Sequence, residues 1–274
     1  IRVPAGDFSA KIMVKVGQLN SKDFPANKKY AIPLSITGAS NYSLIPSQRS
    51  AILLLNRSIL SSVAKVSGGE GIRIKPVGMH TKAEWTIQMS AIYSSLTRSN
   101  LTTAYLSNGT GGAFYTRISS TAGIQVKNGR DGDDTWTQIP LQAGKWLHIT
   151  YVHKDKKTTV YVNGKVQKVF ENSAITFGEN SMIVVGNSGY RNDYLREIRL
   201  WDKALTESEI NDYLYLPMDP ATPHLISYLP LSKEMETKDL KAPAGTENVT
   251  TKARIEYVEN VKFPADELVI VNQE

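Results

Sequence analysis

Four side chains in one short loop could coordinate a metal ion. Asn128, Asp131, Asp133 and Asp134 lie within seven consecutive residues. Because carboxylate and amide oxygens are the ligands that Ca²⁺ takes in proteins, these residues form a candidate calcium site. A hairpin turn rich in Asp and Gly has the same composition without any ion, and Arg130 opposes a cation. Both interpretations stay open, and calcium is the one cofactor that the sequence suggests.

A second polar loop has the composition of a sugar-binding site. Tyrosine rings offer flat faces on which sugars stack, and Asn, Arg and Asp side chains hydrogen-bond hydroxyl groups. The residues of this candidate ligand site are Tyr190, Arg191, Asn192, Asp193 and Tyr194. A mobile polar loop without a ligand explains the same residues.

Three further aromatic side chains could also stack on a sugar. Trp136 joins the candidate ligand site on this ground, with Tyr105 and Tyr115 as further candidates. All three could contact a sugar only if their strands direct the side chains toward the concave face of a sheet. Aromatic residues in strands more often belong to the core, which is the competing interpretation.

Hydrolytic chemistry has less support. A glycosidase places two carboxyl groups on either side of the scissile bond, and alternate positions of one strand would put them on the same face. The nearest acidic pairs are Asp193 with Glu197 and Glu256 with Glu259, and neither has the required spacing. Carboxylates from separate strands would still serve, so a glycoside hydrolase remains an alternative. The sequence favours a protein that is not an enzyme.

Cysteine and histidine usage excludes other kinds of site. The chain has no cysteine, so disulfides, thiolate metal sites and cysteine nucleophiles are absent. His148 and His153 stand five residues apart on one predicted strand. They therefore face opposite sides and cannot share a metal ion. No Gly-x-Ser-x-Gly sequence marks a serine nucleophile.

Composition and charge are those of an ordinary globular protein. Of the 274 residues, 41% are hydrophobic and 21% charged. The net charge is +6, but Lys and Arg are scattered along the chain. Nucleic-acid-binding proteins concentrate their positive charge, so nucleic acid is not an expected partner. The most apolar run, residues 51–55, is too short for a membrane helix.

Short alternating runs predict an all-β chain of two domains. In residues 1–60, runs at 11–16, 30–36 and 50–57 predict a small immunoglobulin-like sandwich. The Ser- and Gly-rich stretch after residue 58 predicts a linker or the entry to the second domain. In residues 61–274 we expect strands over 71–76, 84–93, 102–106, 113–119, 123–127, 135–141, 146–154, 158–162, 165–170, 182–186, 194–201, 225–231 and 252–258.

Two local signals define turns and ends in the second domain. Asn163 and Gly164 predict a type I′ hairpin turn, since both residue types tolerate positive φ angles. Thr206 and Glu209 have the spacing of a capping box and predict one short helix over 206–214.

Five segments of the second domain together resemble the laminin-G-like and pentraxin-like branch of the concanavalin A-like superfamily. They are residues 84–88 with Trp85, 144–151 with Trp146 and His148, 160–165 with the Tyr-Val-Asn-Gly hairpin, 183–186, and 198–210 with Trp201. The resemblance implies a jelly-roll sandwich built for binding, in a family whose members commonly hold calcium at the sandwich rim.

Residues 1–60 resemble the small β domain of unknown function that precedes laminin-G-like domains in Bacteroidetes surface lipoproteins. This resemblance implies a secreted protein at the bacterial outer-membrane surface or in the periplasm. Membrane attachment would come only through a lipid anchor outside this chain. Together the resemblances imply a lectin-like, non-catalytic carbohydrate-binding protein of a glycan-utilisation system. A protein–protein adhesion module is a further alternative.

Overall fold

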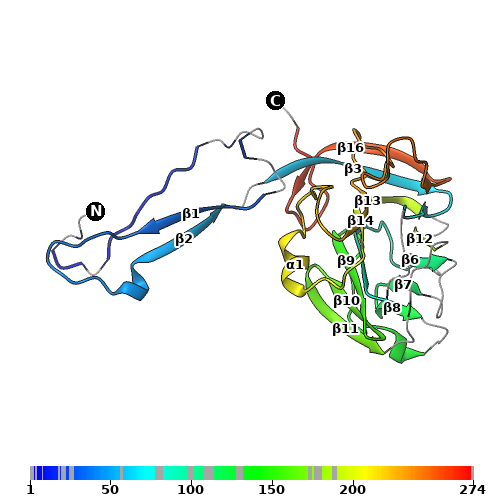
Figure 1. The fold of residues 1–274 in the computed structure, drawn as a ribbon, viewed down its shortest axis with the longest axis horizontal. Coiled ribbons are helices and arrows are strands. Elements are labelled where there is room, and N and C mark those ends of the chain that lie inside the picture. The colour runs from blue at the N-terminus through cyan, green and yellow to red at the C-terminus, as the bar shows by residue number, and fades with distance from the viewer. Residues whose placement is uncertain are drawn as a thin grey trace. The chain divides into compact units, whose positions relative to one another are not determined.

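The computed structural model describes residues 3, 5–7, 9–17, 19, 23–24, 28–55, 58–77, 83–97, 101–107, 114–127, 132–171, 175, 181–186 and 190–272. The chain divides into two compact units, residues 1–56 and 57–274 (Figure 1). Apart from one α-helix and two short 3-10 helices, the regular elements in these ranges are strands, which confirms the all-β prediction. No helix in these ranges is long and apolar enough to span a membrane.

The first unit contains one antiparallel hairpin. β1 (Tyr30–Ser35) pairs with β2 (Ser50–Leu55) along its whole length, and η1 (Pro46–Gln48) lies between them. Both strands were predicted, whereas residues 11–16 form no strand. Ile52 and Leu54 are 68% and 78% exposed. The second sheet of an immunoglobulin-like sandwich is therefore not present in the described part of this unit, because alternation alone does not form a strand without a partner ladder.

The second unit contains two antiparallel sheets that form the layers of a sandwich (Figure 1). The eight-stranded sheet has the order β11 (Lys165–Glu171), β10 (Lys157–Val162), β9 (Leu147–Lys154), β5 (Trp85–Ile92), β13 (Tyr190–Trp201), β3 (Ile59–Gly68) and β16 (Arg254–Phe263), with β14 (Leu225–Leu229) paired to β13. The six-stranded sheet has the order β15 (Val249–Thr250), β4 (Ile72–Ile74), β12 (Met182–Val185), β6 (Thr102–Ser107), β7 (Tyr115–Ser119) and β8 (Gly123–Lys127).

The main core lies between these two sheets. Alternation along each strand sends apolar side chains from both layers into it, as expected for a sandwich. Trp85 is fully buried there, stacked on His153 at 5.1 Å and edge-on to Phe114 at 5.0 Å. Its indole N–H donates to the Ile175 carbonyl at 2.9 Å. Trp85, one of the residues that carry the family resemblance, is therefore a core residue.

A second apolar cluster covers the outer face of the eight-stranded sheet. It joins Val152, Trp201 and Tyr228 of the strands to Ile210 of α1 (Glu207–Asp212). The predicted capping box is present, since the Thr206 hydroxyl accepts from the Glu209 N–H and the Glu209 carboxylate accepts from the Thr206 N–H. The sheet is therefore packed on both faces.

The hairpin between β10 and β11 has the predicted turn. Asn163 and Gly164 have φ angles of 50° and 75°, as a type I′ turn requires. The Asn163 side chain also accepts from the His148 N–H at 2.8 Å, which ties the turn to β9.

The second unit differs from the prediction in two places. The polar stretch after residue 58 is the entry to the second unit and not a linker, and it forms β3, a strand of ten residues inside the eight-stranded sheet. Its small side chains suit that position, since Ser62, Val63 and Ala64 are all buried. The predicted strand over 135–141 is replaced by η2 (Asp133–Thr135) and a single β-bridge from Trp136 to Gln125.

Candidate functional site

The outer face of the six-stranded sheet presents two tyrosines. In β7, Thr116 and Ile118 point inward and are buried, whereas Tyr115, Arg117 and Ser119 alternate to the outer side and are half-buried. Tyr105 of β6 is the cross-strand partner of Tyr115, and their rings lie 6.0 Å apart with a tilt of 42°. We call Tyr105 and Tyr115 the tyrosine platform.

Arg117 connects this platform to a neighbouring pocket. Its guanidinium carbon lies 5.2 Å from the centre of the Tyr115 ring. On its other side Arg117 lines a pocket of about 320 Å³, which we call the Arg117 pocket. The pocket is formed by Leu96, Thr97, Leu101, Arg117, Ile118, Ser119, Ser120, Thr121 and Trp136. An aromatic ring, several hydroxyls and one guanidinium form the mixture that a sugar site uses.

Trp136 is held at this pocket by the segment that follows η2. It forms a β-bridge with Gln125 of β8, and the next residue, Thr137, donates from its N–H to the Ile124 carbonyl at 2.8 Å. Lys168 donates to the Trp136 carbonyl at 2.7 Å. The segment therefore extends the six-stranded sheet by one short bridge and places the indole at the pocket.

Two buried polar atoms on strands β7 and β8 have no hydrogen-bond partner within the described ranges. They are Nε of Arg117 and Oε1 of Gln125. The two residues are cross-strand partners on β7 and β8, so an unused donor and an unused acceptor lie on adjacent strands. Buried polar groups in folded proteins are normally paired with protein, water or a ligand. Of these two residues Arg117 lines the pocket and Gln125 does not, so Arg117 is the one that a molecule in the pocket would contact.

The electrostatic environment of the platform is positive. Burial by itself would raise the pKa of Tyr115, but a hydrogen bond with Thr102 at 2.6 Å and the nearby Arg117 and Lys127 outweigh burial and lower the pKa. The platform and pocket therefore favour a neutral or anionic ligand over a cationic one.

The predicted ligand loop is mostly a strand. β13 begins at Tyr190, so these residues pair with β3 instead of forming a free loop. The Tyr190 side chain lies outside the description, Arg191 and Asn192 are exposed, and Tyr194 is half-buried. They stand on the eight-stranded sheet and do not line the Arg117 pocket, so the structure does not bring them together with Trp136.

Asp193 was predicted to bind a ligand, but its carboxylate accepts hydrogen bonds from other groups of the protein. The side chain is fully buried and accepts from the Ser94 N–H at 2.8 Å and from the Ser94 hydroxyl at 3.0 Å. The same hydroxyl is also 2.7 Å from the Arg191 carbonyl. Leu96 and Thr97, two and three residues further on, form a wall of the Arg117 pocket. Asp193 thus positions that wall and does not itself face a ligand.

The predicted calcium site is described only in part. Asn128 and Asp131 lie outside the described residues, while Asp133 and Asp134 are exposed in η2. Lys168 donates to the Asp134 carbonyl at 2.8 Å, so an ammonium group already lies beside this loop. Within the described ranges, no group of three His, Cys, Asp or Glu side chains could hold a metal ion. Calcium binding stays a prediction.

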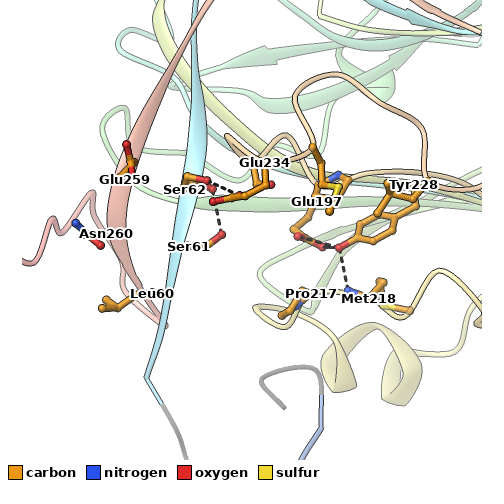
Figure 2. Close-up of a pocket in the computed structure, with 14 residues that line it drawn as sticks. Leu60, Ser61, Ser62, Glu197, Pro217, Met218, Tyr228, Glu234, Glu259 and Asn260 are labelled. Atoms are coloured by element: carbon orange, nitrogen blue, oxygen red, sulfur yellow. Dashed lines mark hydrogen bonds between the residues drawn. The ribbon is translucent and has the colours of Figure 1, made fainter. Parts of the chain in front are cut away.

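A second pocket, of about 350 Å³, lies on the outer side of the eight-stranded sheet and is lined by three glutamates (Figure 2). Glu197 is buried and bonds Arg199 at 2.5 Å and the Tyr228 hydroxyl at 3.0 Å. Glu259 forms an ion pair with Lys233. Figure 2 shows Glu234 turned toward Ser62. These carboxylates are paired with other groups of the protein and do not converge on open space.

Glu234 also lacks the electrostatic character of a general acid. Hydrogen bonds from its own backbone N–H and from the Ser232 hydroxyl lower its pKa. A glycosidase acid needs a raised pKa to remain protonated near neutrality. The second pocket therefore gives no support to the hydrolase alternative.

Comparisons with solved structures identify proteins with a similar fold. A candidate carbohydrate-binding protein from Bacteroides ovatus is 18% identical, with a TM-score of 0.58 over 90% of this chain and 72% of the other. A heptameric pentraxin from Limulus polyphemus is 11% identical, with a TM-score of 0.43 over 73% of this chain and 94% of the other. Domain 4 of a GH43 extracellular arabinanase from Geobacillus stearothermophilus, solved with arabinotriose, is 14% identical, with a TM-score of 0.39 over 66% of this chain and 86% of the other.

No curated protein matches the sequence significantly. The sequence profile of the concanavalin A-like lectin/glucanases superfamily, in its laminin-G form, matches residues 67–211, which is more than half of the chain. The matched segment includes β7, β8, Trp136 and the Asn163–Gly164 turn. The chain therefore belongs to the concanavalin A-like lectin/glucanase superfamily.

Proposed function

We propose that this protein binds carbohydrate without catalysis and that the Arg117 pocket, together with the tyrosine platform, is its binding site. The observation that carries the proposal is that Trp136 and Arg117 line one pocket together with three hydroxyl side chains, Ser119, Ser120 and Thr121. An indole ring and a guanidinium provide the stacking and the hydrogen bonding that a sugar needs. The carbohydrate-binding description of the Bacteroides ovatus protein supports the same ligand class.

The arrangement suits more than one sugar unit. One ring would stack on Trp136 while its hydroxyls bond those of Ser119, Ser120 and Thr121. The tyrosine platform continues along β6 and β7 from the same arginine, so a second unit would lie across Tyr115. Aromatic stacking adds about 0.5–1.5 kcal/mol beyond the area buried, which suits a lectin of moderate affinity.

The absence of catalysis is part of the proposal. The described lining of the Arg117 pocket includes no carboxylate, so no acid and nucleophile face each other there. Two carboxyl groups acting across a bound sugar would instead support the glycoside hydrolase alternative. Release of reducing sugar from a polysaccharide that the protein binds would decide for the hydrolase.

The test is a glycan array probed with the purified protein, with calcium and again with EDTA. We expect the wild-type protein to bind at least one glycan, and we expect both Trp136→Ala and Arg117→Ala to abolish this binding. Arg191→Ala, which removes an exposed arginine on the other sheet, is the matched control and should bind normally. A signal lost in EDTA would show that binding needs a divalent cation, and its loss in Asp133→Ala as well would place that cation at the loop around Asp133. Silence across plant, host and microbial glycans would refute the proposal.

A protein-adhesion role has one observation in its favour. The hairpin of the first unit exposes Ile52 and Leu54, and exposed apolar side chains in a strand suit a protein partner. A silent array would therefore put protein docking ahead of sugar binding.

We also propose the cellular place that the sequence resemblance implies, at the bacterial outer-membrane surface or in the periplasm. Protease treatment of intact cells of the source organism tests it. Digestion of the protein in intact cells would place it at the surface, protection until the outer membrane is opened would place it in the periplasm, and recovery with the cytoplasm would refute both.

A further inference from the structure

We infer that the sugar bound in the Arg117 pocket carries a carboxylate, as uronic acids do, and that Arg117 binds this group. The inference rests on the proposed function and narrows its ligand class. It depends on the lack of a carboxylate partner for Arg117, in contrast to other arginines of the chain, and on the side chains that surround Arg117.

Arg117 lacks the carboxylate partner that other arginines in this chain have. Arg73 lies 2.9 Å from Glu70, Arg199 lies 2.5 Å from Glu197, and Arg254 lies 2.5 Å from Glu256. In the described part of the chain Arg117 has no such ion pair, and its Nε–H is buried without an acceptor. A partly buried guanidinium without a counter-ion is costly, so an anionic ligand would relieve this cost.

The shape of the group also favours a carboxylate. Guanidinium presents its N–H donors in a planar fork that matches the two oxygens of a carboxylate. The guanidinium carbon of Arg117 lies 5.2 Å from the centre of the Tyr115 ring, and its Nε–H has no acceptor within the described residues. Among the nine described lining residues Arg117 is the one charged side chain, so none of these nine would repel the anion.

The hydroxyls of the pocket favour an acidic sugar over a simple anion. Ser119, Ser120 and Thr121 line the pocket together with Arg117, and their hydroxyls can donate to or accept from those of a sugar ring. A guanidinium for a carboxylate and hydroxyls for the ring match a sugar that carries both groups.

Other unpaired buried atoms of the second unit do not form a comparable site. Nε1 of Trp146, Nε2 of His148 and Nε of Arg196 also have no partner in the described ranges. None of these residues lines either pocket. Arg196 is also neutralised by Glu197 at 3.6 Å and stacked on Phe263 at 3.8 Å.

The test compares oligogalacturonides and oligoglucuronides with the same oligosaccharides after methyl esterification, by isothermal titration of the full chain. Esterification removes the charge and leaves the ring and its hydroxyls. We expect at least one acidic series to bind and its ester to bind about tenfold or more weakly, since a hydrogen bond to a charged group contributes about 1.5–3 kcal/mol. Arg117→Gln should weaken acid binding about tenfold, so that the acid then binds no better than its ester. Arg117→Lys should rescue it only in part, because lysine lacks the fork.

Controls separate this inference from the proposed function. Arg191→Gln removes an exposed charge on the other sheet and should change neither affinity. Equal binding of acid and ester that disappears in Trp136→Ala would overturn the inference and leave the proposed function intact. A preference for sulfated neutral sugars over both uronic acid series would also overturn it. No binding of any sugar, with the glycan array silent, would overturn the proposed function itself.

Discussion

At the scale of single residues, side chains of the same type have different roles, depending on the groups that they contact. Arg199 is fully buried, bonds Glu197 and donates to the Tyr213 and Leu216 carbonyls at 3.0 and 2.6 Å, so it fastens the outer layer to the sheet. Arg117 has no such set of acceptors and remains available. Sequence shows two arginines in strands, and only the neighbours distinguish a structural arginine from a binding one.

The buried imidazole of His153 should make stability depend on pH. Burial lowers its pKa from 6.5 to about 4. Its Nε2 accepts from the Ile175 N–H at 3.1 Å, so the ring is neutral in the folded protein. As the pH falls, His153 is protonated near pH 6.5 in the unfolded chain but only near pH 4 in the folded protein. The stability that the neutral imidazole contributes is therefore fully present above pH 6.5 and is lost as the pH falls to about 4. We expect this residue to contribute a loss of about 2–3 kcal/mol.

Urea denaturation at several pH values measures this loss. His148 is also buried with a lowered pKa and titrates in the same direction, so the difference between wild type and His153→Gln isolates His153. The variant should have a shallower pH dependence between pH 6.5 and 4. Identical slopes in wild type and His153→Gln would refute the assignment.

At the scale of elements, the Arg117 pocket depends on a contact between strand β13 and the chain after β5. Asp193→Ala removes the acceptor that holds the Ser94 N–H and hydroxyl. We expect sugar affinity to fall several-fold and the free energy of unfolding to drop by about 1–3 kcal/mol, because buried donors lose their partner. Titration and urea denaturation measure the two effects. Arg191→Ala, which alters an exposed side chain on the same strand, is the control. Unchanged affinity in a destabilised Asp193→Ala would show that the wall of the pocket does not need this contact.

A pair of glycines tests how tightly the β10–β11 hairpin packs. Gly164 and Gly144 have nearly the same positive φ, 75° and 76°. A β-carbon on Gly164 would collide with the Asn211 side chain, whereas one on Gly144 would meet open space. Gly144→Ala should cost about 1 kcal/mol from backbone strain alone. Gly164→Ala should cost more, measured as the drop in thermal midpoint. Equal midpoints would mean that Asn211 moves away freely.

Local signals predicted the elements better than the site. The Asn163–Gly164 turn and the Thr206–Glu209 capping box depend on neighbours in sequence, so a single sequence contains them in full. The Arg117 pocket depends on which strands are adjacent, since Trp136 reaches it only by bridging β8. Trp136 was predicted for its ring, but Arg117 was missed because an arginine in an alternating strand is ordinarily a solvated residue. β3 was missed because small side chains at the centre of a sheet have the composition of a linker.

At the scale of the whole molecule, the sandwich and its site belong to one unit. The described core runs from Ala64 to Leu231 and draws on both sheets, and residues 1–56 contribute nothing to it. The lining of the Arg117 pocket likewise falls between Leu96 and Trp136. The second unit therefore contains the apolar surface needed for an independent fold together with every described group of the proposed sugar site.

Residues 57–274 produced alone should therefore fold and bind sugar with the affinity of the full chain. We expect cooperative thermal unfolding and an unchanged dissociation constant for the sugar selected on the array, because neither the core nor the pocket uses a residue from the first unit. Trp136→Ala in the same shortened chain is the control, since it should abolish binding and leave the fold in place. Loss of binding in a well-folded 57–274 would mean that residues 1–56 contribute to the site. A chain 57–274 that does not fold would show that the first unit stabilises the second.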